Sequence, residues 1–186
     1  MEPVILRTPR LLLRPFSASD GEGLYRILSD GETVKYEPYP PFSREEADAE
    51  AARRATDPAF WAVCLPDGTL IGTLFFSDCA FYGAELGYVF SRPHWGNGYA
   101  AEAARAVMEH AFATTDLHRV CAMCNPENVR SWRLLERLGM RREGVFRQDI
   151  FFSRRPDGSP VWQDTYLYAI LRDEFLPPAE QKLSVQ

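Results

Sequence analysis

Apolar residues follow two spacings along the chain, and together these predict a domain that mixes strands with helices. Short apolar runs bounded by Gly, Pro or Asp are typical of strands, and such runs recur through most of the chain. The turn Pro66-Asp67-Gly68-Thr69 predicts a hairpin between two of them. The expected strands are residues 10–14, 61–65, 70–76, 84–91, 119–124, 145–152 and 162–171.

Four other segments place apolar residues at helical spacing. They begin after the N-cap Ser19-Asp20, at the capping box Ser43-Arg44-Glu45-Glu46, at Gly98 and at Asn128. The second extends to about residue 56 and is rich in Ala and polar residues, so we expect it to bury little and to act as a lid. The buried stripe expected on the third is Ala101, Ala104, Met108, Ala111 and Phe112.

Composition narrows the class of protein. A chain of 186 residues that is 46% hydrophobic can bury one substantial core, which predicts a single mixed α/β domain over 1–176 and a polar tail over 177–186. The formal net charge of -5 argues against nucleic-acid binding and is compatible with a cationic substrate such as an amine. Without an apolar run long enough for a bilayer, or a signal-peptide pattern, we expect a cytoplasmic protein that does not bind membranes.

The four cysteines are interpreted as small hydrophobic residues rather than as a metal or redox site. Cys121 and Cys124 form a C-x-x-C pattern, but on a strand residues three apart point to opposite faces. A second C-x-x-C pair and a His cluster are both missing from the sequence. We therefore expect no bound metal.

The segment Trp95-Gly96-Asn97-Gly98-Tyr99-Ala100 lies between a predicted strand and a predicted helix. The two glycines expose successive backbone N–H groups, and the helix N-terminus adds a partial positive charge, so the segment could hold a phosphate group. A tight turn without a ligand needs glycine just as much. The third glycine of the dinucleotide fingerprint and the Gly-Lys-Ser/Thr of the P-loop are absent, which excludes those two nucleotide sites.

This segment resembles the pyrophosphate loop of the GNAT superfamily of acyl-CoA N-acyltransferases, which reads Gln/Arg-x-x-Gly-x-Gly/Ala. Trp95 replaces the usual Gln or Arg, a variant similar to the branch of ribosomal-protein-alanine N-acetyltransferases, the RimJ/RimL-like enzymes. The resemblance continues over nearly the whole chain. Its carriers are Thr8-Pro9-Arg10-Leu11-Leu12-Leu13-Arg14, Cys124-Asn125-Pro126-Glu127-Asn128-Val129-Arg130-Ser131, Leu134-Leu135-Glu136-Arg137-Leu138-Gly139-Met140, Glu143-Gly144 and the ending 164–171.

The resemblance implies a fold, a cosubstrate and a binding site. The fold would be a single α/β (α+β) domain with a central, mixed and mostly antiparallel sheet of six to seven strands, flanked by about four helices. The cosubstrate would be acetyl-CoA, with no metal. By this resemblance the coenzyme contacts Val89, Phe90, Trp95, Gly96, Asn97, Gly98, Tyr99, Ala100 and Asn128, and an oxyanion donor comes from a backbone N–H near Val89.

The resemblance also implies catalytic roles, each with a simpler alternative. Glu85 would accept the amine proton through a water molecule, and the alternative is that Glu85 is an ordinary solvated carboxylate on a strand. Asp149 is the second candidate base. Ser131 would return a proton to the thiolate, because no Tyr lies between Asn128 and Gly139. Asn128 and Ser131 are equally well explained as helix-capping residues.

The acceptor is expected to be a primary amine, with a protein N-terminal α-amino group favoured by the branch resemblance. A small-molecule amine (an aminoglycoside, a polyamine or an amino-acid-like metabolite) and a catalytically silent acyl-CoA-binding module are the alternatives. The state of assembly is left open between monomer and homodimer. Arg130, Arg133 and Arg137 share a helix face that is either solvated or near the adenosine phosphates. An acceptor pocket could be lined by Tyr36, Tyr39, Phe42, Phe81, Tyr82 and Trp162.

Overall fold

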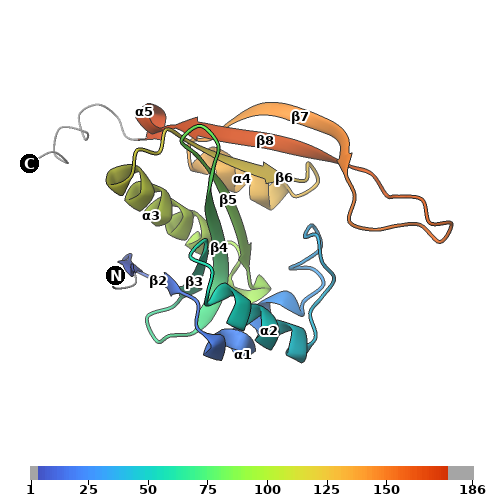
Figure 1. Ribbon diagram of the computed structural model, residues 1–186, viewed down its shortest axis with the longest axis horizontal. Coiled ribbons are helices and arrows are strands. Elements are labelled where there is room, and N and C mark those ends of the chain that lie inside the picture. Colours follow the sequence, from blue (N-terminus) through green and yellow to red (C-terminus); the bar gives the residue numbers. More distant parts are fainter. Residues whose placement is uncertain (1–3, 176–186) are drawn as a thin grey trace, which may run out of the picture.

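The computed structural model describes residues 4–175, which form one twisted eight-stranded sheet with helices on both faces (Figure 1). All neighbouring strands are antiparallel except β5 and β6. The strand order is β1-β2-β3-β4-β5-β6-β8-β7. The strands are β1 (Leu6–Arg7), β2 (Leu12–Pro15), β3 (Phe60–Cys64), β4 (Leu70–Cys79), β5 (Gly83–Phe90), β6 (Arg119–Cys124), β7 (Arg141–Ile150) and β8 (Gln163–Leu171).

Within the described residues the helices are α1 (Gly21–Leu28), α2 (Arg44–Arg54), α3 (Tyr99–Thr114), α4 (Val129–Arg137) and α5 (Arg172–Phe175), with short 3-10 turns at Ala18–Asp20 and Arg92–His94. The predicted fold class is confirmed, with one strand and one helix more than expected. The added β1 and α5 are two and four residues long, too short to show a periodic pattern. The predicted tail at 177–186 lies outside the described residues.

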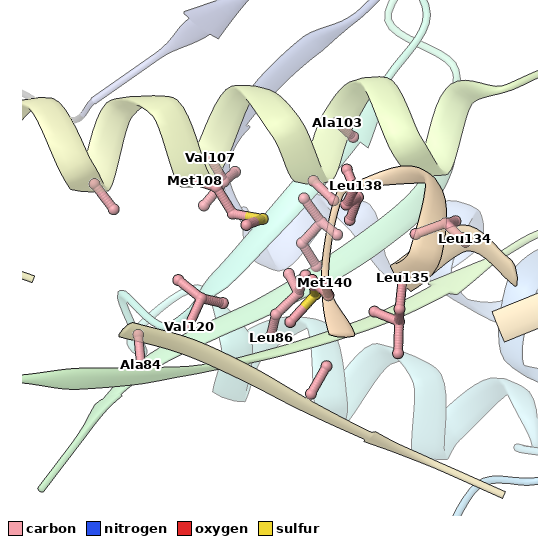
Figure 2. Packing of buried hydrophobic residues seen from close by; sticks show 14 of the residues in the cluster. Ala84, Leu86, Ala103, Val107, Met108, Val120, Leu134, Leu135, Leu138 and Met140 are labelled. Atoms are coloured by element: carbon pink, nitrogen blue, oxygen red, sulfur yellow. The ribbon is translucent and has the colours of Figure 1, made fainter. Parts of the chain in front are cut away.

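Two separate cores lie on opposite faces of the sheet. On one face, α3 and α4 pack against β5 and β6: Figure 2 shows Val107 and Met108 of α3 directed toward Leu86 and Val120. On the other face, α1 and α2 cover β3 through a second cluster that includes Leu24, Ile27, Ala51, Ala62 and Cys64. Strand alternation explains the division, since successive side chains of one strand point to opposite faces.

One predicted element boundary is confirmed and another was wrong. Helix α1 begins after Asp20 as expected, and a short 3-10 turn precedes it, capped by Ser17, whose side chain accepts from the Ser19 N–H while Asp20 accepts from the Ser17 N–H. Strand β7 starts at Arg141 instead of Val145 because Arg141 and Arg142 pair with β8. Their charges hid the strand, as β7 is a sheet edge where exposed charged residues are common.

The prediction that the second helix acts as a lid was also wrong. Ala47 and Ala51 are fully buried against α1, and Arg54 is only 4% exposed. The Arg54 guanidinium donates to Glu50 at 2.8 Å and to the Thr73 hydroxyl at 3.0 Å. Small side chains let α2 approach closely, so a helix of low hydrophobicity is nonetheless part of the core.

The cysteines fit the expected packing role only in part. Cys64 and Cys124 are buried, Cys121 is half-buried and Cys79 is exposed, and all four are free thiols. In the described part of the chain, no group of three or more His, Cys, Asp or Glu side chains is arranged to hold a metal ion. None of the helices in residues 4–175 is both long enough and apolar enough to cross a membrane.

Candidate active site

Strands β5 and β6 diverge halfway along their length, and this opening is the main feature of the site. Their parallel pairing is confined to Gly83–Glu85 of β5 with Arg119–Cys121 of β6. Beyond Glu85 the two strands separate, and Figure 1 shows β5 running steeply while β6, β8 and β7 cross above it. A cleft of about 390 Å³ lies here, bounded by the end of β5, the following loop, α4 and the segment before α2. The two parallel strands therefore separate at the cleft and leave a gap in the sheet.

The loop after β5 forms one end of the cleft. Gly96 and Gly98 have φ of 79° and 80°, a left-handed conformation that glycine adopts without strain. Gly98 is the N-cap of α3, so the loop delivers free backbone N–H groups at a helix N-terminus. A Cβ built on Gly96 meets nothing within 4 Å, so the loop is open to a ligand. This geometry suits a phosphate or pyrophosphate.

Trp95 explains how the loop works without the usual Gln or Arg. Its indole N–H donates to the Phe90 carbonyl at 2.6 Å, which joins the loop to the end of β5. The Arg130 guanidinium stacks over the Trp95 ring at 4.7 Å. Trp95 thus anchors the loop and orients a cation beside it. The Asn97 amide folds back onto the His94 and Trp95 carbonyls, so Asn97 shapes the loop as well.

Arg10 holds the loop from outside. Its guanidinium donates to the Asn97 carbonyl at 2.9 Å and to Glu102 in the first turn of α3 at 2.7 Å, and it stacks on Tyr99 at 4.7 Å. The Thr8 hydroxyl also donates to Glu102, at 2.5 Å. These bonds tie the start of the chain to the loop and keep its conformation formed before a ligand arrives.

Replacing Arg10 with alanine is expected to raise the Kd for acetyl-CoA by about threefold to tenfold, a modest effect because the ion pair is partly exposed. The value of kcat at saturation should change little. Isothermal titration calorimetry measures the Kd, and Arg26→Ala, which removes an exposed ion pair on α1, is the control. An unchanged Kd would show that Arg10 does not preorganise the loop.

The arginines of α4 lie on the cleft wall. Arg130, Arg133 and Arg137 all line it, and Lys35 lines the opposite side. All three side chains are exposed, so this helix face is both solvated and part of the cleft wall. Together with the loop amides, these cations give the cleft a donor set suited to a ligand with several phosphate groups.

Farther along the cleft, Tyr88 and Ser131 form a hydroxyl pair. The two oxygens are 2.9 Å apart, and the Tyr88 hydroxyl is also 3.0 Å from the Ser131 carbonyl. Burial raises the pKa of the Tyr88 phenol, and the hydrogen bond with Ser131 acts to lower that pKa. The net effect is a rise, so the phenol stays protonated at neutral pH. The sequence reasoning missed Tyr88 because it examined α4 alone for a tyrosine. Asn128 caps α4 by accepting from the Ser131 N–H at 3.2 Å.

Strand alternation indicates which β5 amides face the opening. The Ser91 N–H donates to the carbonyl of Ile71, near the start of β4. The backbone N–H of Val89, two residues before Ser91, therefore also points toward β4. The backbone N–H groups of Tyr88 and Phe90 point the other way, toward the gap between β5 and β6. The candidates for the oxyanion donor expected near Val89 are therefore the backbone N–H groups of Tyr88 and Phe90.

The two predicted bases do not line this cleft. Glu85 is half-buried and lies at the last position where β5 pairs with β6. Its side chain is on the opposite face of the sheet from its buried neighbours Ala84 and Leu86. Asp149 lies exposed near the end of β7. Among the coenzyme residues expected from the sequence, the cleft lining contains Val89, Phe90, Trp95, Gly96, Ala100 and Asn128, whereas Asn97, Gly98 and Tyr99 are not in it.

Of the six aromatic residues predicted to line an acceptor pocket, only Tyr36 lines this cleft. Tyr36 lines the cleft, and its hydroxyl donates to the Glu127 carbonyl at 3.3 Å. Tyr39 and Phe42 stack on each other beside the second core. Phe81 and Tyr82 form the exposed turn between β4 and β5, and Trp162 is exposed against Phe151.

Glu37 is a cleft residue that sequence reasoning missed. Burial raises the pKa of its carboxyl to about 7, although Tyr39 hydrogen-bonding and the Arg54 charge both act to lower that pKa. No motif surrounds Glu37 in the sequence, and its only local signal is a position between two tyrosines. Thr33, on the same wall, has a buried hydroxyl with no hydrogen-bond partner in the described part of the chain.

The fold and the cleft combine a sheet whose central strands diverge with backbone amides and arginines suited to a multiply phosphorylated ligand. Residues 10–141 match the acetyltransferase (GNAT) domain family, and the chain belongs to that family. It is 38% identical to the uncharacterized N-acetyltransferase YnaD of Bacillus subtilis (strain 168), over 91% of this chain and 98% of YnaD. The protein is thus an N-acyltransferase of the GNAT type.

A solved structure supports the fold over almost the whole chain. The GNAT-family acetyltransferase from Bacillus anthracis is 35% identical and superposes with a TM-score of 0.83, covering 92% of this chain and 100% of that one. The [ribosomal protein uS5]-alanine N-acetyltransferase of Escherichia coli (strain K12) is 32% identical, but over 58% of this chain and 54% of its own length. The relatives of higher identity are not named for an acceptor, so the predicted branch is not established.

Proposed function

We propose that this protein transfers the acetyl group of acetyl-CoA to a primary amine, with the α-amino group of a protein or peptide as the preferred acceptor. The observation that carries the proposal is a single cleft with an anion-binding loop and arginine row at one end and a buried hydroxyl pair at the other. The phosphates would bind Gly96, Gly98 and the arginines, and the thioester would lie near Tyr88 and Ser131.

The reaction needs a neutral amine, an oxyanion donor and a proton for the leaving thiolate. In the proposed mechanism the amine nitrogen forms a bond to the thioester carbon, while a β5 amide next to Val89 stabilises the oxyanion. The C–S bond then breaks, and the Ser131 hydroxyl gives its proton to the thiolate. Tyr88 hydrogen-bonds Ser131 and can replace that proton. Glu85 as the base stays a prediction from the sequence.

Two considerations support an α-amino acceptor. An α-amino group has a reference pKa of roughly 7.7 to 8 against about 10.4 for Lys, so a much larger fraction of it is neutral and nucleophilic at neutral pH. The partial match is to a protein named as an alanine N-acetyltransferase of ribosomal protein uS5, and alanine has no side-chain amine, so a protein α-amino group is the acceptor class that this match favours. Small-molecule amines are the competing acceptors.

A competition assay tests the acceptor class. We expect that peptides with a free N-terminus release thiol from acetyl-CoA with a higher kcat/KM than their Nα-blocked, lysine-containing counterparts, polyamines or aminoglycosides. The assay follows free thiol, and the blocked peptide is the matched control. A polyamine or aminoglycoside with the highest kcat/KM would move the assignment to a small-molecule enzyme. Tight acetyl-CoA binding without turnover of any amine would leave only a binding module.

A further inference from the structure

We propose that Glu37, and not Glu85, is the general base that accepts the proton of the attacking amine. This assignment rests on the acetyl transfer proposed above and specifies the residue that activates the acceptor. Glu37 lines the same cleft as Tyr88 and Ser131, whereas Glu85 does not line it. A base and an acid that line the same cleft would act on one thioester bound there.

The segment that carries Glu37 is fixed at both ends. At its start, the Asp30 carboxylate pairs with Arg92, beside the phosphate loop, at 2.8 Å. At its end, Tyr36 bonds the Glu127 carbonyl just before α4. The Glu37 N–H itself donates to the Val34 carbonyl at 2.9 Å, which closes a turn. The segment that brings Glu37 to the cleft is therefore tied both to the 3-10 turn before the phosphate loop and to the residues before α4.

The groups around Glu37 leave it able to exchange a proton. Tyr39 contacts its carboxylate by a hydrogen bond, the charge of Arg54 of α2 reaches it, and its own charge reaches Tyr88 of β5. Arg54 is already bonded to Glu50 and Thr73, so it does not neutralise Glu37 completely. The other charged or titratable groups on the cleft are Glu32, Lys35, His94, Arg130, Arg133 and Arg137, besides the tyrosines Tyr36 and Tyr88. Burial outweighs the nearby charge, and the net pKa of about 7 suits a base at neutral pH.

The proton balance is complete without any further reactant. The nitrogen of a neutral amine attacks the thioester carbon, and one N–H proton passes to the Glu37 carboxylate as the C–N bond forms. The C–S bond breaks, and the thiolate takes its proton from Ser131. Glu37 then releases its proton to solvent, and solvent returns one proton to Ser131 through the Tyr88 hydroxyl, so no group is left changed. The products are the amide and free coenzyme A.

The test compares Glu37→Gln, Glu37→Asp, Glu85→Gln and the exposed control Glu45→Gln, which lies on α2 outside the cleft. We expect Glu37→Gln to lower kcat by about 100-fold with an unchanged Kd for acetyl-CoA, since general-base catalysis contributes about 10²- to 10⁴-fold. The kcat of wild type should fall as pH decreases through about 7, the pKa of Glu37, and this acidic limb should vanish in Glu37→Gln and persist in Glu37→Asp.

A second measurement does not depend on turnover. In protein labelled with ¹³C at glutamate carboxyl carbons, one signal should titrate near pH 7 in wild type and be missing in Glu37→Gln. If wild type acetylates an amine, and Glu37→Gln keeps its kcat and acidic limb while Glu85→Gln loses both, the assignment is overturned. If wild type acetylates nothing, the proposed function fails, and absence of the titrating signal would overturn the Glu37 assignment separately.

Discussion

Replacing Ser131 with alanine is expected to lower kcat by about 100-fold, because the thiolate then leaves without its proton donor, and general-acid steps contribute about 10²- to 10⁴-fold. The Kd for acetyl-CoA should stay near that of wild type, since Ser131 is proposed to act on the departing sulfur. Stopped-flow measurement of the chemical step isolates the effect from product release. The alanine retains the backbone N–H that Asn128 caps.

Tyr88→Phe provides the matching half of a double-mutant cycle. If Tyr88 acts through Ser131, the double variant should be little slower than Ser131→Ala alone, because the two hydroxyls serve one proton path. Ser153→Ala, at an exposed position in the β7–β8 connection, is the control and should behave as wild type. Unchanged kcat in Ser131→Ala would remove Ser131 from the mechanism and leave a water molecule as the acid.

Gly98→Ala is expected to weaken acetyl-CoA binding by about tenfold or more. Gly98 has a φ of 80°, and an L-residue in the left-handed region costs about 1 to 2 kcal/mol, which the loop can avoid only by turning its amides. The added Cβ would also meet the Arg10 guanidinium at 3.4 Å. Calorimetric titration with acetyl-CoA measures the loss.

Gly158→Ala separates binding from backbone strain. Gly158 has a φ of 83° and open space around its Cα, but it lies in the β7–β8 connection. Both variants should lose stability by similar amounts in urea unfolding, and only Gly98→Ala should lose affinity. Equal affinities in the two variants would contradict a phosphate-binding role for the loop.

The parts of the site that lie on continuous segments were predictable from sequence. The loop from Trp95 to Ala100 and the α4 start at Asn128 each combine an element boundary with residues that favour it, so their local structure follows from the chain itself. The boundary that failed, at Arg141, depends on pairing with β8, a strand distant in the sequence. Pairing of that kind leaves little trace in local hydrophobic periodicity.

Glu37 and Tyr88 show what sequence reasoning could not reach. Tyr88 meets Ser131 only because β5 and β6 separate, and that separation is a property of the sheet as a whole. Burial raises the pKa of Glu37, and the segment that carries Glu37 is held by contacts with Arg92 and Glu127, both distant in the chain. Glu85 was predicted from its strand position, a local feature that does not indicate which side of the sheet a cleft opens on.

The most direct test of the account is mass spectrometry of one peptide that has a free N-terminal alanine and a single internal lysine, incubated with acetyl-CoA and the protein. The account predicts one added acetyl group, located by fragmentation on the α-amine, with an equal amount of thiol released. An unmodified peptide and unmodified amines of every other class, at a concentration of acetyl-CoA that saturates the cleft, would contradict it.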